Sequence, residues 1–181
     1  MASKVDQLLT AYELVVNEPW SNALSGQERV WFLVYDPAEQ RKVDLRIGDF
    51  EMATKKAGKR WITISLKKCF PIWMASHDYK EEYFNDPETL VDQLESEFKK
   101  FAITFLIEEI NKQGTDDKTL IAVRDISALF GFNRMSDILN GCANSFKGRM
   151  LIFFPGEYDK NQYRLLDARD GWSYLARPIT A

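Results

Sequence analysis

The sequence predicts an α/β protein with a single open sheet in three layers, mostly parallel, of about five strands with helices on both faces. Short apolar runs alternate with longer stretches in which apolar residues recur every three or four positions, which is the pattern of strands alternating with amphipathic helices. The run Met150–Phe154 has the length and branching of a strand buried on both faces. Two further apolar runs, Val30–Tyr35 and Trp61–Leu66, flank a helical stretch and so form a βαβ unit with parallel strands.

The chain of 181 residues is predicted to form one domain over 1–181, with 1–26 as an N-terminal helix and loop packed on it. An apolar fraction of 45% provides for a hydrophobic core, and a net charge of −3 argues against coating nucleic acid by bulk charge. Cys69 and Cys142 lack CxxC spacing and are expected to be reduced thiols. With no signal peptide and no apolar run of roughly 20 residues, we expect a cytoplasmic protein without membrane contact.

The first half of the chain has clear boundaries. A helix is expected over Ser3–Val16, with Ser3 and Asp6 as a capping pair. The strand Val30–Tyr35 ends at Asp36-Pro37, and a helix then runs to Ala57, with Gly58 as its C′ residue. The expected inward face of this helix is Leu45, Ile47, Phe50, Met52 and Ala53. The segment Cys69–Ser76 is apolar and broken by Pro71.

The second half contains the longest predicted helix, Pro87–Lys112, whose apolar stripe begins at Leu90 and Val91. A third strand, Thr119–Val123, precedes a helix that starts near Met135 and ends at Gly148. Pro155-Gly156 is predicted to stop the strand Met150–Phe154, because proline lacks an N–H group and glycine tolerates a positive φ. Tyr163–Leu166 is the fifth strand, and Tyr174–Ala176 is a possible edge strand stopped by Pro178.

Motifs for cofactors are lacking in the sequence, and no cofactor is predicted. Gly58-Lys59-Arg60 has neither the earlier glycine nor the hydroxyl residue of a phosphate-binding loop. One histidine and two distant cysteines do not provide the closely spaced ligands of a zinc site. His77 would be the single imidazole base for nucleophilic catalysis, and its place in an acidic loop predicts a solvated residue. The interpretation is therefore a protein that is not an enzyme.

Three carboxylates leave an enzymatic alternative open. Asp36 and Asp125 follow two predicted strands and Glu157 follows a third, so they could converge at one sheet edge and bind Mg²⁺. A divalent-metal-dependent phosphoesterase or nuclease is then the natural activity. Each residue also has an ordinary structural role: Asp36 and Asp125 can cap the turns that follow them, and Glu157 can pair with an arginine.

Two surfaces are candidates for partner binding. Arginines and aromatic residues, which dominate protein interfaces, gather after the strand Met150–Phe154. The candidate partner-binding residues there are Glu157, Tyr158, Arg164, Arg169, Asp170 and Trp172. The acidic segment 78–97 is the second candidate. The same arginines and aromatics could stack on bases, so a nucleic-acid-binding module stays a further alternative.

Several sequence pieces resemble one known family. The runs LFGFNRMSDIL and GRMLIFFPGEYDKNQYRLLDARDGWSYLARPI are similar to the BrxB family of bacteriophage-exclusion (BREX) defence systems, described as a domain of unknown function. The segments WFLVYDP, EMATKKAG and WMASHDYKEEYF look similar as well, so the resemblance covers nearly the whole chain. FFPGEY and RLLDARDGW are its most specific pieces.

The resemblance implies membership of a multi-gene antiviral system. Such systems also contain an adenine DNA methyltransferase, a large ATPase and an alkaline-phosphatase-like protein called PglZ. BrxB-like proteins look like accessory subunits that assemble with these, and a PglZ-like protein is the expected partner, followed by the methyltransferase and the ATPase. The family offers no established catalytic residues to carry over to this chain.

Overall fold

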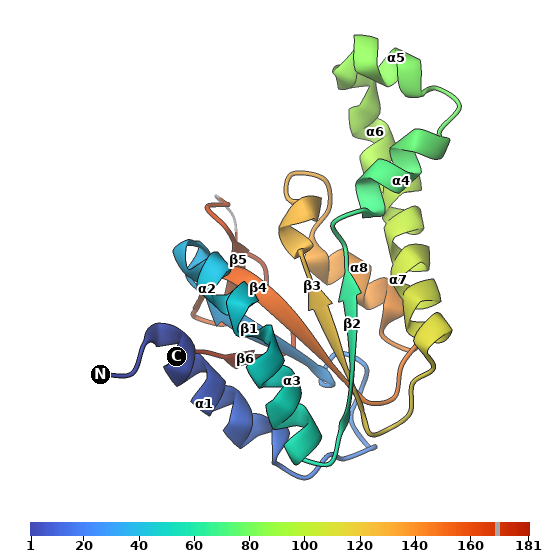
Figure 1. The fold of residues 1–181 in the computed structure, drawn as a ribbon. Coiled ribbons are helices and arrows are strands. Elements are labelled where there is room, and N and C mark those ends of the chain that lie inside the picture. The colour runs from blue at the N-terminus through green and yellow to red at the C-terminus, as the bar shows by residue number, and fades with distance from the viewer. Residues whose placement is uncertain (169–170) are drawn as a thin grey trace.

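An open, mostly parallel sheet forms the centre of the computed structural model, which describes residues 1–168 and 171–181 (Figure 1). Five parallel strands lie in the order β2-β3-β4-β1-β6, and β5 pairs antiparallel with β4. Their bounds are β1 (Val30–Tyr35), β2 (Arg60–Ser65), β3 (Thr119–Arg124), β4 (Arg149–Asp159), β5 (Gln162–Leu165) and β6 (Arg177–Ile179). The predicted α/β class is confirmed, with helices around the sheet.

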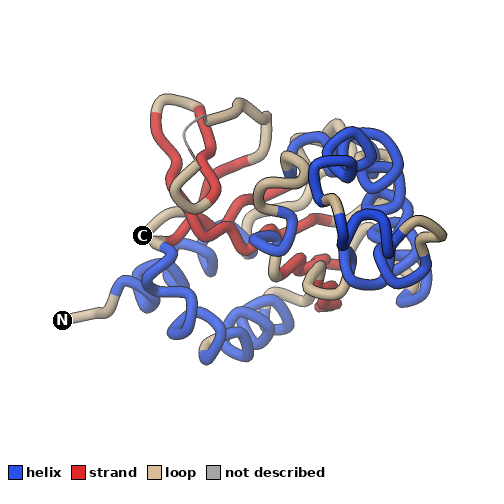
Figure 2. The backbone as a smooth tube through the Cα atoms, turned by 90° about the horizontal axis from the view of Figure 1, so that it is seen from above, coloured by secondary structure: helices blue, strands red, loops and turns tan. Residues whose placement is uncertain are grey.

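Helices cover both faces of the sheet, as the view in Figure 2 shows. One face carries α1 (Lys4–Val16), α2 (Gln40–Leu45) and α3 (Ile47–Lys56); the other carries α4 (Cys69–Ser76), α7 (Lys99–Gln113) and α8 (Met135–Cys142). Successive side chains of a strand point to opposite faces, so β1 contributes to both cores. Trp31 and Leu33 pack with α1 and α3, whereas Phe32 and Val34 pack with the α7 side. Within the described ranges, no helix is long and apolar enough to cross a bilayer.

The predicted cap of α1 is confirmed. The Ser3 hydroxyl accepts a hydrogen bond from the Asp6 backbone N–H at 3.2 Å, and the Asp6 carboxylate accepts one from the Ser3 N–H at 2.9 Å. Arg46 donates to Asp6 at 2.8 Å from the connection between α2 and α3. Hydrogen bonds from Ser3, followed by the Arg46 guanidinium, lower the pKa of Asp6 to about 2.

The predicted helix over 37–57 is interrupted. A 3₁₀ turn, η1 (Pro37–Glu39), precedes α2, and α3 starts after Arg46, whose φ of −106° and ψ of 9° leave the helical region. The interruption shifts the phase of the helix faces, so the prediction that Leu45 and Met52 point inward is wrong and both are exposed. Phe50 and Ala53 are buried as predicted, and Val43 is a further buried residue of this stretch. Gly58, with a φ of 74°, ends α3 as predicted.

Residues 69–98, here called the arm, form a helical projection beyond the carboxyl ends of the strands (Figure 1). The apolar segment Cys69–Ser76 is the helix α4, because Pro71 lies in its first turn, where a missing N–H costs nothing. The chain continues through α5 (Lys80–Asn85), η2 (Pro87–Leu90) and α6 (Val91–Gln93). The π-helical turn η3 (Leu94–Phe98) then leads into α7, so the predicted helix over 87–112 consists of three short turns of different helical type followed by the 15-residue helix α7.

The prediction that Pro155-Gly156 stops the fourth strand is wrong. Pro155 lies opposite Tyr35, the last residue of β1, so the proline occurs where the parallel pairing ends. β4 continues to Asp159 and pairs with β5, with Gly156 opposite Leu165. A two-residue turn of Lys160 and Asn161, at φ 48° and 63°, closes the hairpin.

The last strand also differs from the prediction. β6 comprises Arg177–Ile179 rather than Tyr174–Ala176, and it includes Pro178, which was expected to stop it. β6 lies at the edge of the sheet, where a proline need not donate to a neighbouring strand. The helix expected to end at Gly148 ends at Cys142.

Gly156→Ala should destabilise the β4–β5 hairpin. A Cβ atom at Gly156 would lie 2.0 Å from the backbone oxygen of Arg164, so the paired strands must separate. We expect the free energy of unfolding to fall by about 1–3 kcal/mol in chemical denaturation. Gly48→Ala is the control, because nothing lies within 4 Å of its added Cβ, and it should stabilise α3 by about 0.5–1 kcal/mol. Equal midpoints for Gly156→Ala and the wild type would contradict the hairpin register.

Asp6→Asn should lower stability at neutral pH and flatten the acid dependence. The pKa of Asp6 is depressed in the folded state, so its contribution is complete above its ordinary pKa of 3.8 and is lost as the pH falls through about 2. The difference between wild type and variant should therefore be largest at about pH 5 and above and should shrink toward about pH 2. Urea denaturation across this pH range measures it. A difference that stays constant would show that the charge of Asp6 is not responsible.

Candidate functional site

The connections that leave the carboxyl ends of the neighbouring strands β1 and β4 run in opposite directions across the sheet. From β1 the chain passes through α2 and α3 to β2, on the far side of β4 and β3. From β4 it passes through β5 to β6, on the other side of β1. In open α/β sheets, the crevice outside the strand ends at such a switch point is the usual place for a ligand.

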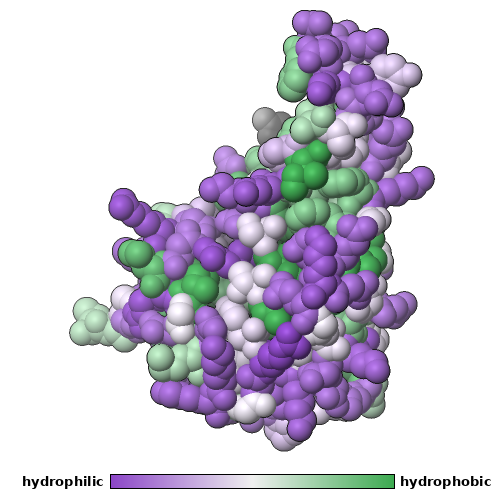
Figure 3. Space-filling model, turned by 45° about the vertical axis from the view of Figure 1, so that its right-hand side comes forward, coloured by the Kyte–Doolittle hydropathy of each residue, from purple (hydrophilic) through white to green (hydrophobic). Residues whose placement is uncertain are grey.

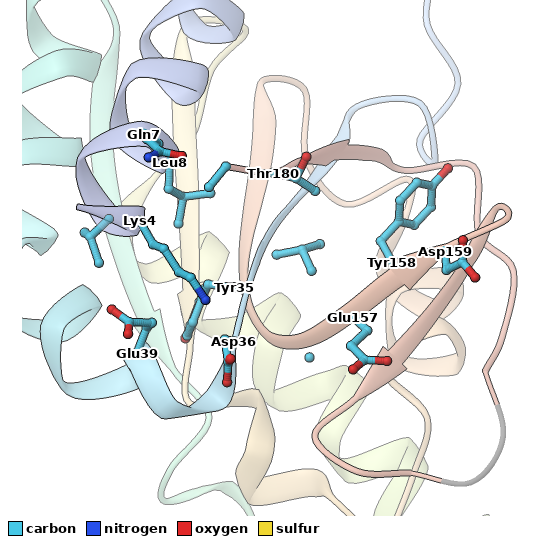
Figure 4. A pocket seen from close by; sticks show the side chains of 14 residues that line it. Lys4, Gln7, Leu8, Tyr35, Asp36, Glu39, Glu157, Tyr158, Asp159 and Thr180 are labelled. Atoms are coloured by element: carbon cyan, nitrogen blue, oxygen red, sulfur yellow. The ribbon is translucent and has the colours of Figure 1, made fainter. Parts of the chain in front are cut away.

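A pocket of about 470 Å³ occupies this crevice (Figure 4). Lys4 and Gln7 reach it from the first turns of α1, Tyr35 and Asp36 from the end of β1, and Glu157 from β4. Figure 4 shows Lys4 and Glu157 approaching from opposite sides, with Thr180 at the third side. The fold thus places side chains from three distant segments around one space, which we call the sheet-edge pocket.

The charged residues that line the sheet-edge pocket are mainly acidic. Asp36, Glu39, Glu157 and Asp159 face one lysine, Lys4. Glu39 forms an ion pair with Lys42 at 3.0 Å, and the Asp36 carboxylate accepts a hydrogen bond from the Ala38 N–H at 2.9 Å. Glu157 is paired with Arg164 at 3.8 Å, so three of the four acids already have structural partners.

Tyr35 lines the sheet-edge pocket as a buried, neutral phenol. Burial, followed by the nearby Asp44 carboxylate, raises the pKa of Tyr35 above its usual range. Its hydroxyl donates to the side-chain oxygen of Gln40 at 2.8 Å. With its proton held in this way, Tyr35 is suited to position α2 and has little capacity to act as a base.

The structure brings together only part of the predicted carboxylate set. Asp36 and Glu157 both line the sheet-edge pocket, whereas Asp125 does not. Asp125 follows β3 at a φ of 61° and accepts a hydrogen bond from the Ser65 hydroxyl, and it makes no side-chain cap of the next turn. Among residues 1–168 and 171–181, no group of three or more His, Cys, Asp or Glu side chains is placed to hold a metal ion.

The candidate partner-binding residues divide into different environments. Glu157 and Arg164 lie opposite each other on β4 and β5 and form an exposed ion pair at 3.8 Å. Tyr158 is half-buried and donates to Asn161 at 3.0 Å. Arg169 and Asp170 lie outside the described residues.

Trp172 belongs to an aromatic cluster. Its ring centroid lies 5.8 Å from those of Phe32 and Phe154 and 5.7 Å from that of Tyr163. The backbones of Trp172 and Tyr163 exchange two hydrogen bonds at 2.8 and 2.9 Å, and the Tyr163 hydroxyl donates to the Ala176 carbonyl at 2.6 Å. Trp172 therefore fixes the returning chain against the hairpin, and little of it is free for a partner.

The arm presents the acidic segment 78–97 together with large apolar side chains. Phe84, Val91 and Tyr79 are 65%, 60% and 58% exposed. The prediction that Val91 belongs to a buried stripe is wrong, because the change to 3₁₀ geometry before α6 and to π geometry after it alters the helical phase. Figure 3 shows a mainly hydrophilic arm with separate hydrophobic patches. The sequence identified the acids of this surface and missed its exposed aromatics.

His77 links the first helix of the arm to its last turn. Its Nε2 atom lies 3.0 Å from a Glu97 carboxylate oxygen, and its ring meets Trp73 at a centroid distance of 5.0 Å. The predicted solvated position is wrong, since the His77 side chain is largely enclosed by these neighbours. His77 thus joins α4 to the π-helical turn η3.

Comparisons with family models, with curated proteins and with solved structures found no match for this chain.

Substitutions at Trp172 and Arg164 should differ in their effect on the stability of the fold. Trp172→Ala removes a half-buried ring from the aromatic cluster and should lower the free energy of unfolding by about 2 kcal/mol or more. Arg164→Ala removes one exposed side chain of a surface ion pair, so stability should change by less than about 0.5 kcal/mol. Thermal and urea denaturation of both variants measure these effects. A Trp172→Ala protein as stable as the wild type would contradict the packing described here.

Proposed function

We propose that this chain is a non-catalytic accessory subunit of a BREX anti-phage system that docks a PglZ-like protein and thereby supports host DNA methylation and phage restriction. The sequence resemblance to BrxB proteins supports the choice of system and partner. The observation that carries the docking role is the arm, a projection that combines exposed large apolar side chains with a strong negative charge. Such a surface fits a basic partner surface that contains apolar pockets.

Charge is unevenly divided along the chain. Residues 78–97 contain eight acidic side chains and one lysine, a net charge of −7, whereas the whole chain has −3. The rest of the chain therefore has a net charge of −3 − (−7) = +4. Complementary charge accelerates the encounter of two proteins and selects among partners, so the concentration of acids on a projection favours a basic partner surface at that place.

Buried aromatic side chains pack beneath the part of the arm that carries its exposed aromatics. Tyr83 of α5 is buried next to the exposed Phe84, and its ring lies 5.0 Å from His77. Phe98 is fully buried at the base of the arm, 5.3 Å from Trp73. A backbone segment that is ordered before binding loses less conformational entropy when a partner covers it. Phe84 and Tyr79 are thus suited to be the central contacts of an interface.

Phe84→Ala should weaken binding of the PglZ-like protein by about tenfold or more without loss of stability. Truncation of a central interface aromatic typically costs about 2 kcal/mol, while an exposed side chain contributes little to folding. Co-purification with the PglZ-like protein, followed by calorimetric titration, measures the affinity. Leu45→Ala is the matched control, because Leu45 is also exposed and apolar but lies on α2, at the opposite face of the sheet.

Several results would contradict the proposal. Elution of the chain alone from pairings with the PglZ-like protein, the methyltransferase and the ATPase would remove the docking role. Equal effects of Phe84→Ala and Leu45→Ala would place the interface away from the arm. Metal-dependent cleavage of a phosphodiester by the purified chain, lost in Asp36→Asn, would favour the enzymatic alternative. Binding to DNA or RNA with an affinity that falls steeply with salt would favour the nucleic-acid alternative.

A further inference from the structure

The strand β2 ends the sheet on one side, and among the described strands it pairs with β3 alone (Figure 1). The pairing is regular over six consecutive residue pairs, from Arg60 with Thr119 to Ser65 with Arg124. At the other side of the sheet, β6 has only three residues and contains Pro178. Short length and proline are common devices that protect a sheet edge from a further strand. β2 has neither, so its outer edge is the one open to a further strand.

The backbone groups on this outer edge belong to Trp61, Thr63 and Ser65. The N–H groups of Arg60 and Leu66, at the two ends of β2, donate to carbonyl groups at the start and end of β3, at 2.9 and 3.1 Å. Backbone groups of successive residues in a strand point to alternate sides, so the even-numbered residues bond to β3 and the odd-numbered ones face outward. Thr63 and Ser65 are exposed and Trp61 is half-buried. The edge therefore presents N–H and C=O groups that an added strand can pair with.

A side chain already bonds to this edge as the backbone of a further strand does. The Nε2 atom of Gln113, at the end of α7, donates to the Thr63 carbonyl at 3.2 Å. The hydrogen bonds of the described residues include none from the N–H groups of Trp61 or Thr63 to a side chain or a loop. Gln113 is exposed, so its amide can leave when a backbone N–H takes its place. In the free chain, Gln113 thus satisfies one carbonyl that a partner strand can take over.

The charges around β2 all have one sign. Between Glu51 and Asp78 the chain contains six lysine or arginine side chains and no aspartate or glutamate. Of the six, Lys55 alone forms an ion pair with a described residue, Glu51, at 2.6 Å. The six are Lys55, Lys56, Lys59, Arg60, Lys67 and Lys68. Because they lie on both sides of the uncharged stretch 61–66, they repel the same edge of a second copy and attract a strand with acidic ends.

We propose that the outer edge of β2 binds an extended acidic segment of another protein, which adds to the sheet as a further strand. The uncharged centre of that segment pairs with Trp61–Ser65, and its acidic ends lie beside the cations that flank β2. Backbone hydrogen bonds supply affinity in this mode of binding, and the flanking charges select the partner. The edge is distinct from the arm that contains Phe84, so the inference does not depend on the proposed docking role.

Three synthetic peptides with the same centre of alternating threonine and valine test this assignment. The first has two glutamates at each end, the second has two lysines at each end, and the third is the acidic peptide with every central backbone nitrogen methylated. In titrations of the full chain followed by NMR, the first peptide should bind about tenfold more tightly than either of the others. The largest amide shifts should belong to Trp61, Thr63 and Ser65. Equal affinities of the acidic peptide and its methylated form, or no binding at millimolar concentration, would overturn the proposal.

Thr63→Pro removes one outward N–H group without loss of a hydrogen bond to β3, and it should weaken binding of the acidic peptide by about tenfold. Lys67→Glu tests the charge and decides if Thr63→Pro fails to fold, with an expected loss of about fivefold. Lys160→Glu is the matched control: it makes the same change at the exposed turn between β4 and β5 and should leave the affinity unchanged.

Three outcomes would contradict the assignment of an acidic strand to this edge. The first is wild-type affinity for the acidic peptide in folded Thr63→Pro or in Lys67→Glu. The second is a dimer of the free chain that Thr63→Pro dissociates, which would assign the edge to a second copy. The third is tighter binding of single-stranded DNA than of the acidic peptide, which would assign the cations to nucleic acid.

Discussion

The pairing of β1 with β4 is the interaction on which the rest of the structure depends. Six consecutive residue pairs join these strands, from Val30 with Met150 to Tyr35 with Pro155, and every one of the twelve residues is buried. Phe32 at the middle of β1 stacks on Phe154 at a centroid distance of 5.2 Å, and Tyr163 meets it edge-on at 4.4 Å. The same pairing positions the central strands, the aromatic cluster of the hairpin and the switch point that holds the sheet-edge pocket. A substitution that weakens the pairing of β1 with β4 would disturb all three.

Fold class could be predicted from the sequence because buried parallel strands are continuous apolar runs, and β1, β3 and β4 were located by that pattern. Prediction failed where a residue's effect depends on its strand neighbours. Pro155 and Pro178 look like strand breakers, yet each lies where no neighbouring strand needs its N–H group. Leu45 and Val91 fit an ideal helical period, but irregular turns changed the phase of their helices. Such turns are produced by tertiary contacts that no local pattern contains.

The same distinction between local sequence pattern and tertiary contact applies to the candidate sites. Asp36 and Glu157 could be assigned to one sheet edge because the carboxyl ends of parallel strands meet, whereas Asp125 does not line the pocket and accepts a hydrogen bond from Ser65. Trp172 looked like an interface residue from its type alone, and the structure gives it a packing role. The environment of Asn133 could not be found in advance: its Nδ2 atom donates to the Leu94 carbonyl and its buried Oδ1 atom has no partner among the described residues, and both properties arise only when these two segments meet. A sequence shows the chemistry of each side chain, but it does not show which polar atoms find a hydrogen-bond partner.

Strand order has a consequence for the growing polypeptide on the ribosome. Val30 pairs with Met150, which is synthesised 120 residues later, and Trp31 pairs with Arg177, later still. At translation rates of about 5–20 residues per second, the apolar strand β1 waits roughly 6–24 s for its first partner. During that interval it can associate with other nascent chains or with chaperones, and slow non-local pairing prolongs the exposure. The topology therefore makes cellular yield depend on protection of residues 30–35 during synthesis.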